Sequence, residues 1–90
     1  MSAPSGGSAV RTVVEVLARA LTDRPDEVYV KESQQKETTL IELFVGQGEL
    51  GRVIGKQGRT AAALRTLAAS AGEKEGKTVT LEIRDSPYKG

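Results

Sequence analysis

The hydrophobic residues of the chain first recur at the spacing of a helix. From residue 9 onward they lie three and four positions apart, which places them on one face of an amphipathic helix. The residues of this face are Val10, Val13, Val14, Leu17, Ala18 and Leu21. Ser8 is a candidate N-cap, and Thr22-Asp23-Arg24-Pro25 ends the helix, because the residue before a proline avoids the α region.

The pattern then changes to the alternation of two β-strands. The first strand starts at Glu27 and turns Val28 and Val30 to one side. The polar segment Ser33-Gln34-Gln35-Lys36 is the turn that follows it, and the second strand covers Thr38 to Val45. One face of the second strand holds Thr39, Ile41, Leu43 and Val45. Its other face is also partly apolar, so we expect it to be better covered than the first strand.

Two helices and a third strand complete the predicted order. Gly46-Gln47-Gly48 ends the second strand, and a short helix follows from Glu49 to Ile54. A longer helix runs from Arg59 to about Ala71, and Gly72 is its expected C′ residue. The inward stripe of the longer helix is Leu64, Leu67, Ala68 and Ala71. The strand from Thr78 to Arg84 turns inward Val79, Leu81 and Ile83.

The order helix, strand, strand, helix, helix, strand predicts an α+β fold. Three short strands cannot bury both faces of their sheet, so we expect the three helices to pack on one face. A chain of 90 residues suits one small domain. We predict a single domain over residues 9–84, a disordered N-terminal tail over residues 1–8, which is rich in Pro, Gly and Ser, and a frayed C-terminal tail over residues 85–90.

Composition excludes several classes of function. The chain has no Cys and no His, which removes disulfides, the usual zinc sites and the commonest general base at neutral pH. No apolar run approaches the roughly 20 residues that cross a bilayer, and the N-terminus lacks the pattern of a secretion signal. We therefore expect a non-enzymatic cytoplasmic protein with no membrane association and no metal.

The charges are distributed unevenly, although the net charge is only +1. The segment from residue 50 to residue 72 carries Arg52, Lys56, Arg59 and Arg65 and no acidic residue, while the chain before it is acidic. This basic island includes two glycines that flank two polar residues. Glycine lets the backbone turn tightly and brings its N–H groups close to a ligand. The combination of positive charge and flanking glycines indicates a binding site for phosphate groups.

Two nucleotide-binding motifs overlap this segment, but each lacks a feature that its function requires. Gly46-x-Gly48-x-x-Gly51 follows a strand like a dinucleotide fingerprint, but Gly55 interrupts the next helix and a chain of this length has no room for a doubly wound sheet. The string from Gly51 to Lys56 is one residue short of a P-loop, and Gln57 stands where a hydroxyl would meet magnesium. We therefore expect no small-molecule cofactor.

The string Val53-Ile54-Gly55-Lys56-Gln57-Gly58, placed between two helices, resembles the KH family of RNA-binding domains. The element order resembles the type II arrangement of that family, over about residues 9–84. The longer run from Gly51 to Ala61 is similar to the KhpA-like family of small bacterial single-KH proteins. The resemblance implies a type II KH fold and an RNA chaperone or post-transcriptional regulator that binds single-stranded RNA.

The resemblance also implies roles for individual residues. Gly55, Lys56, Gln57 and Gly58 would run along the sugar-phosphate backbone, while about four bases lie in a groove between the helices and a strand. Many KH domains have Ile at the position of Ala61. The groove floor of this chain is therefore expected to be shallower or differently packed.

Physical chemistry supports a phosphate site here. The first N–H groups of the helix after Gly58 have no intrahelical partners, and the helix dipole favours an anion beside them. Lys56 and Arg59 add cations, Arg52 is expected on the same rim, and Gln57 can donate without adding charge.

Three other sets of residues bear on base recognition. Ile54 is either core or groove wall, and Arg65 either reaches RNA or covers exposed surface. Tyr29, Phe44 and Tyr88 are too scattered in the sequence for an aromatic stacking platform. We therefore expect base contacts to consist of apolar packing and edge hydrogen bonds.

A single site of this kind should bind weakly. Linking two sites raises avidity without new contacts, so we expect a homodimer or a larger KH-containing partner protein, as the resemblance also implies. An alternative of another class is a protein-interaction adaptor that uses the KH scaffold with RNA not its main ligand. The basic island argues against the adaptor, and the acidic surface before it leaves the adaptor open.

Overall fold

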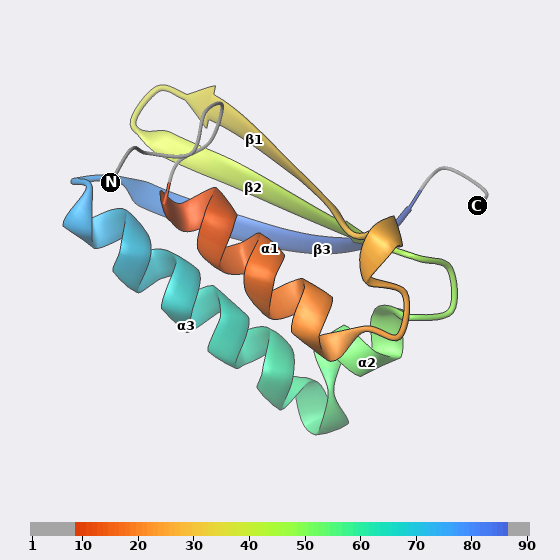
Figure 1. Ribbon diagram of the computed structural model, residues 1–90. Helices are drawn as coiled ribbons and strands as arrows, with labels where there is room; N and C mark the ends of the chain where they lie inside the picture. The colour runs from red at the N-terminus through yellow and green to blue at the C-terminus, as the bar shows by residue number, and fades with distance from the viewer. Residues whose placement is uncertain (1–8, 87–90) are drawn as a thin grey trace.

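The computed structural model describes residues 9–86 and has the predicted order of helices and strands (Figure 1). The elements are α1 Ala9–Leu21, the 3-10 turn η1 Pro25–Glu27, β1 Tyr29–Gln35, β2 Thr38–Val45, α2 Leu50–Ile54, the 3-10 turn η2 Lys56–Gly58, α3 Arg59–Lys74 and β3 Thr78–Asp85. The predicted Ser8 N-cap and the tails at residues 1–8 and 87–90 lie outside the described residues. No helix among residues 9–86 is long and apolar enough to span a bilayer.

The three strands form one mixed sheet in the order β1-β2-β3. β2 is antiparallel to β1, with Tyr29 opposite Phe44, and parallel to β3, with Ile41 opposite Leu81. α1 and α3 lie side by side across one face of this sheet, and α2 lies at one end of it (Figure 1). The expected α+β architecture, with helices on one face only, is therefore confirmed.

The hydrophobic core lies between that face of the sheet and the helices. Its buried residues are Val10, Val14, Ala18, Val28, Val30, Ile41, Leu43, Val45, Val53, Leu64, Ala68 and Leu81. Every second residue of β2 is buried, which is the pattern of a central strand covered on one face. The inward faces predicted for β1 and β2 are confirmed by this core. That of α1 is confirmed in part, because Val10, Val14 and Ala18 are buried whereas Leu21 is 38% exposed.

The boundaries of the hairpin differ from the prediction. Pro25 starts the 3-10 turn η1, because its fixed φ suits the first position of a helical turn, and β1 therefore begins at Tyr29 instead of Glu27. β1 continues to Gln35, through most of the segment predicted as a turn. Lys36 takes a left-handed φ of 52°, so the chain reverses at Lys36 and Glu37 without the usual Asn-Gly or Asp-Gly pair.

The end of α3 also differs from the prediction. The helix continues to Lys74, and Gly72 lies inside it, packed so closely against Val79 of β3 that a Cβ atom would overlap with that side chain. Gly76, with a φ of 70°, is the C′ residue. The N–H of Lys77 donates to the Gly72 carbonyl at 2.8 Å and that of Gly76 to the Glu73 carbonyl at 3.0 Å, which is a Schellman motif.

Three smaller differences complete the comparison. Leu67 was predicted to face the core, but it is 47% exposed, and Ala61 is buried in the stripe of α3 instead. α2 begins at Leu50, one residue later than predicted. β3 includes Asp85, and the N–H of Ser86 donates to the Val45 carbonyl at 2.8 Å, so ordered structure extends two residues into the segment expected to be frayed.

Candidate nucleic-acid interface

The segment Gly55–Gly58 forms a tight loop between α2 and α3. Gly55 has φ 75° and ψ 177°, Gln57 has φ 57° and Gly58 has φ 71°. The hydroxyl side chain of Thr60 occupies the space where a Cβ atom of Gly55 would lie, whereas a Cβ atom at Gly58 would meet nothing within 4 Å. Gly55 is therefore required both by its backbone angles and by packing, whereas at Gly58 the left-handed backbone angle favours glycine without excluding other residues.

The polar side chains of the loop point into solvent. Lys56, Gln57 and Arg59 are all exposed. α3 begins directly after Gly58, and no described side chain caps its first N–H groups. The loop thus presents two cations, one amide and the positive end of a helix dipole at one place, which is a suitable surface for phosphate oxygens.

Arg52 lies on α2 beside this loop, but its guanidinium contacts carboxylates. Its Nη2 lies 2.9 Å from Oδ2 of Asp23, and its Nε lies 3.6 Å from Oε2 of Glu49. Asp23 belongs to the segment between α1 and η1. Arg52 therefore adds less positive charge to the loop than its place in the basic island predicts.

Glu49 is a buried residue of this region that the sequence interpretation missed. It is 6% exposed, and its Oε1 accepts hydrogen bonds from the Thr22 hydroxyl at 2.6 Å and the Asp23 N–H at 2.7 Å. These hydrogen bonds, with a smaller contribution from Arg52, hold the pKa of the Glu49 carboxyl below its ordinary value. Glu49 thereby joins the end of α1 to the start of α2 by hydrogen bonds. The only signal of this role in the sequence was an acidic residue directly before a helix.

Arg65 extends from α3 towards β3. Its Nε donates to the Leu81 carbonyl at 3.4 Å, and β3 is an edge strand of the sheet. Ile54, at the end of α2, is partly exposed, whereas Val53 is fully buried. Ala61 is 4% exposed, so its small side chain lies in the core, under the first turns of α3.

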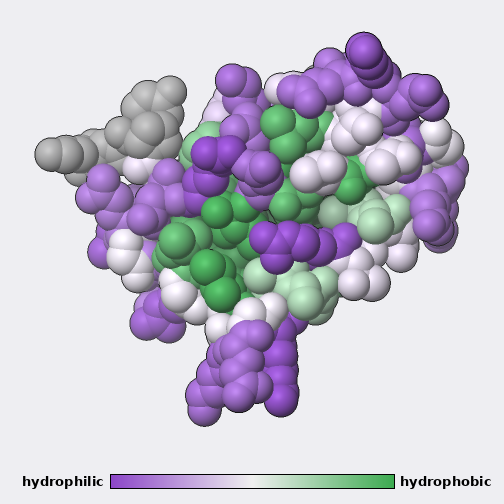
Figure 2. Space-filling model, turned by 180° about the vertical axis from the view of Figure 1, so that it is seen from behind, coloured by the Kyte–Doolittle hydropathy of each residue, from purple (hydrophilic) through white to green (hydrophobic). Residues whose placement is uncertain are grey.

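The side of the molecule that α1 does not cover carries a hydrophobic surface. In Figure 1 α1 lies in front of β3, and Figure 2 shows the molecule from behind. A continuous hydrophobic area occupies the centre of that view, with hydrophilic residues around it and across it. Hydrophobic surface of this kind is typical of a binding site.

The structure thus brings together most of the predicted site residues. Gly55, Lys56, Gln57, Gly58 and Arg59 form one continuous surface. Ile54 directly precedes this surface, Arg65 lies further along α3, and Arg52 is directed to acidic residues. The glycines before α2 are turn residues, of which Gly46 packs against Glu27.

Comparison with known proteins identifies the family. The family model described as KhpA/KhpB, KH domain matches residues 11–83. The chain belongs to this family. It is 51% identical over 76 residues to the RNA-binding protein KhpA of Aquifex aeolicus, which covers 84% of this chain and 96% of that protein. It is 46% identical over 76 residues to KhpA of Halalkalibacterium halodurans, covering 84% of this chain and all of that protein (100%). The helix-strand-strand-helix-helix-strand architecture is accordingly that of a KH domain.

The prediction that the aromatic residues are scattered is wrong for two of the three residues. Tyr29 and Phe44 are opposite each other on β1 and β2, with ring centroids 6.0 Å apart. They are 15 positions apart in sequence, and the hairpin register brings them together. Tyr88 lies outside the described residues.

Proposed function

We propose that the chain binds single-stranded RNA through the Gly55–Gly58 loop. The observation that supports this most strongly is the loop geometry. Exposed Lys56 and Gln57 precede the start of α3, where the Arg59 N–H donates to the Lys56 carbonyl and no described side chain caps the helix. The KhpA relatives are named RNA-binding proteins. A phosphate group at the start of α3 would accept hydrogen bonds from backbone N–H groups, and Lys56 and Arg59 would neutralise its charge.

The bases would lie in a groove between α3 and β3, on the side where the Arg65 Nε donates to the Leu81 carbonyl. Ile54 would form part of the wall of this groove, and Arg65 would reach the bases or the backbone from α3. Arg52 would contribute to RNA binding when a phosphate group displaces its carboxylate partners Asp23 and Glu49. With about three phosphates neutralised, log K should fall with log[salt] at a slope of roughly −2.

We propose a binding role, and not catalysis, for this site. Among residues 9–86 no group of three or more acidic side chains is arranged to hold a metal ion. An RNA chaperone or post-transcriptional regulator in the cytoplasm is the function that this binding surface would serve. The adaptor role is the alternative, and RNA binding itself distinguishes the two.

A pair of substitutions that introduce negative charge tests the site. Lys56→Asp with Gln57→Asp places two negative charges at the loop and keeps both glycines. Gln35→Asp with Lys36→Asp makes the same two changes at the exposed β1–β2 turn and is the matched control. We expect the loop variant to lose at least about 1.4 kcal/mol of binding free energy for single-stranded RNA, a tenfold change, and the control to change little.

Circular dichroism and urea unfolding show whether both variants remain folded. Undiminished RNA binding by the folded loop variant would refute the assigned site. Failure of the parent chain to bind any single-stranded RNA would favour the adaptor function.

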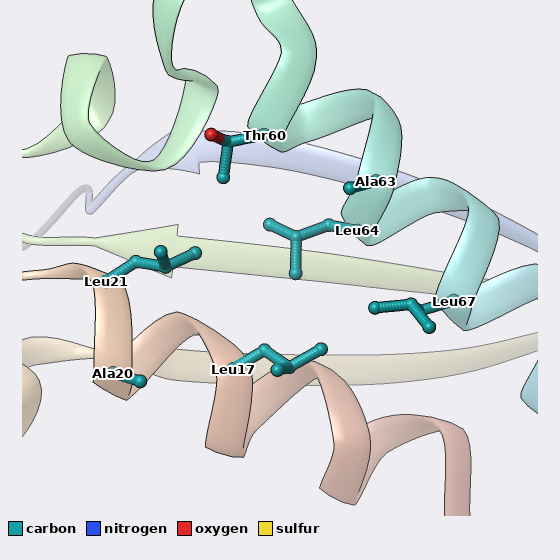
Figure 3. A pocket seen from close by; sticks show the side chains of 7 residues that line it. All are labelled: Leu17, Ala20, Leu21, Thr60, Ala63, Leu64 and Leu67. Atoms are coloured by element: carbon teal, nitrogen blue, oxygen red, sulfur yellow. The ribbon is translucent and has the colours of Figure 1, made fainter.

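We also propose that two copies of the chain pair through the groove between α1 and α3. Figure 3 shows Leu17 and Leu21 of α1 and Leu64 and Leu67 of α3 pointing into the space between the helices. Val16 beside it is 60% exposed and Leu67 is 47% exposed. Exposed apolar side chains along one groove are typical of a protein interface. A larger KH-containing partner is the alternative occupant.

Sedimentation of a groove variant tests this pairing. Leu67→Glu places a charge in the groove, and Ala69→Glu places the same charge on an exposed part of α3 that does not line it. We expect the parent and Ala69→Glu to show a concentration-dependent mass and Leu67→Glu to remain monomeric. A parent that stays monomeric at all concentrations would contradict the homodimer.

A further inference from the structure

The face of the sheet opposite the helices carries a row of aromatic and basic residues. The register places Tyr29 opposite Phe44 and Phe44 opposite Arg84, so the three residues cross β1, β2 and β3 in one line. Side chains of paired residues point to the same face of a sheet. Val28, Val30, Leu43 and Val45, which alternate with the two aromatic residues, are buried on the helix side. The row therefore lies on the face that no helix covers.

The Tyr29 ring is open to solvent, and the Phe44 ring beside it is partly buried. Their centroids are 6.0 Å apart with an angle of 30° between the planes, and Tyr29 is 53% exposed. A cross-strand aromatic pair stabilises a sheet by roughly 0.2–1 kcal/mol, which accounts for the contact between the rings. It does not account for the exposure of more than half of Tyr29. A nucleobase can stack on such a ring, because every base has a π-face.

The row lies next to the groove in which the bases of bound RNA are proposed to lie. β3 takes part in both surfaces, since its Leu81 carbonyl accepts the Arg65 hydrogen bond on the groove side and Arg84 belongs to the row. Neighbouring strands are about 4.8 Å apart, so an RNA strand leaving the groove has to cross only β3 to reach Phe44. The row is also at the end of the sheet where β2 leads towards α2.

The charges around the row are balanced. Arg84 pairs with Glu42, at 3.5 Å, and with Glu82. Lys31 is opposite Glu42 in the register. Phosphate groups therefore gain little at this place, and stacking has to supply the attraction. Contacts made by stacking are tolerant of base identity and depend little on salt.

We infer that Tyr29 and Phe44 form a second contact for the same single-stranded RNA, on which unpaired bases beyond the loop and groove stack. This inference rests on the proposed RNA binding by the Gly55–Gly58 loop. A protein partner fits the face less well, because charged residues alternate with the few apolar ones, and a stable interface commonly buries about 800 Å² on each side.

The length of the RNA separates this contact from the loop. Tyr29→Leu with Phe44→Leu keeps apolar residues in the strands and removes both rings. Random-sequence RNA of about four nucleotides fills the loop and groove, and RNA of about twelve nucleotides is long enough to reach the row. We expect the double variant to bind the shorter RNA like the parent and the longer RNA at least about fivefold more weakly. The ratio of the two Kd values for the longer RNA should stay constant between about 50 and 200 mM salt.

A fluorescent variant gives a direct readout of stacking. The chain has no Trp, so Tyr29→Trp introduces a single indole. Its emission should be quenched by the longer RNA and not by the shorter one. Equal binding of the longer RNA by the parent and the leucine variant, or an indole that the longer RNA does not quench, would overturn the second contact while leaving the loop site intact.

Three further outcomes have a defined meaning. Loss of binding to both RNA lengths in the Lys56→Asp, Gln57→Asp variant would support the loop site. It would also show that the aromatic row binds RNA only when the loop binds it. A parent that binds neither RNA overturns the proposed function and the second contact together. A change of sedimentation mass in the leucine variant would show that the face is a protein interface and would also overturn the inference.

Discussion

The Arg52 guanidinium lies 2.9 Å from the Asp23 carboxylate, across the junction between α2 and the end of α1. The basic residue beside the loop is therefore already paired before RNA arrives. Both side chains are more than half exposed, so the pair itself is worth roughly 0–1 kcal/mol. A phosphate group has to displace Asp23 or share Arg52 with it.

Removal of the Asp23 charge should therefore strengthen RNA binding. Asp23→Asn frees Arg52 from this partner, and we expect the Kd for single-stranded RNA to fall about threefold, or roughly 0.6 kcal/mol. The slope of log K against log[salt] should become steeper by about 0.7, one additional phosphate. Filter binding at several salt concentrations measures both quantities.

The control for this substitution is Asp26→Asn, which removes an exposed carboxylate from η1. It changes the net charge equally and should alter affinity less. In a double-mutant cycle the gain from Asp23→Asn should disappear when Arg52 is replaced by Ala. A gain that persists without Arg52 would show that Asp23 acts by long-range repulsion.

The buried carboxylate of Glu49 predicts a pH dependence of stability. Its pKa is lowered from an ordinary value of 4.5 by the Thr22 hydroxyl and the Asp23 N–H. The folded state therefore binds this proton less readily than the unfolded state, and the stabilisation is fully present above that value. We expect the free energy of unfolding to decrease as the pH falls below about 4.5 and through the lower folded pKa.

Glu49→Gln isolates this contribution, because the amide oxygen can still accept the two hydrogen bonds and has no charge. Urea unfolding at neutral pH should show the variant to be less stable than the parent. The difference should become smaller below pH 4.5, as the parent carboxyl is protonated. A difference in unfolding free energy that is independent of pH would show that Glu49 stabilises the fold through the shape of its side chain and not through its charge.

The sequence predicted the repeating parts of the fold well, because they depend on local periodicity. The inward faces of α1 and β2 follow directly from their apolar spacing. The end of α3 was missed because both Gly72 and Gly76 are followed by charged residues, and only the contact of Gly72 with Val79 favours the later stop. Helix propensity depends on the local sequence, so it does not include the contact of Gly72 with Val79, which lies 7 positions later on β3.

The loop was found from sequence because its glycines and cations are contiguous. The Glu49 hydrogen bonds and the pair Tyr29–Phe44 were not found, since each joins segments that are distant in sequence. The aromatic pair depends on the hairpin register, which in turn depends on the position of the turn. The polar composition predicted a turn over residues 33–36, whereas the chain turns at Lys36 and Glu37.

The two helical glycines Gly72 and Gly51 should respond to alanine in opposite directions. Alanine is favoured over glycine inside a helix by about 1 kcal/mol. Nothing lies within 4 Å of the Cβ position of Gly51, so Gly51→Ala should stabilise the chain by about 0.5–1 kcal/mol. Gly72→Ala pushes against Val79 and the Lys77 carbonyl and should destabilise it by about 1–3 kcal/mol.

Urea unfolding of the two variants measures the sign of both changes. The Gly51 carbonyl accepts a hydrogen bond from the Gly55 N–H at 2.9 Å, which Gly51→Ala keeps. Adding Val79→Ala to Gly72→Ala removes the methyl groups that the new Cβ meets. The cost of the alanine should then be smaller in that background. A Gly72→Ala variant as stable as the parent would mean that α3 and β3 separate more easily than their packing suggests.

The two loop glycines should also differ from each other. The φ of 75° and ψ of 177° at Gly55 lie in a region that is essentially restricted to glycine, whereas Gly58, at φ 71° and ψ 14°, lies in the left-handed region that other residues visit. Gly55→Ala also places a methyl group on Thr60. We expect Gly55→Ala to weaken RNA binding at least tenfold, about 1.4 kcal/mol, and Gly58→Ala to weaken it by less. Equal losses in the two variants, with both folded by circular dichroism, would mean that close approach of RNA to the backbone, and not the conformation of Gly55, determines the requirement for glycine.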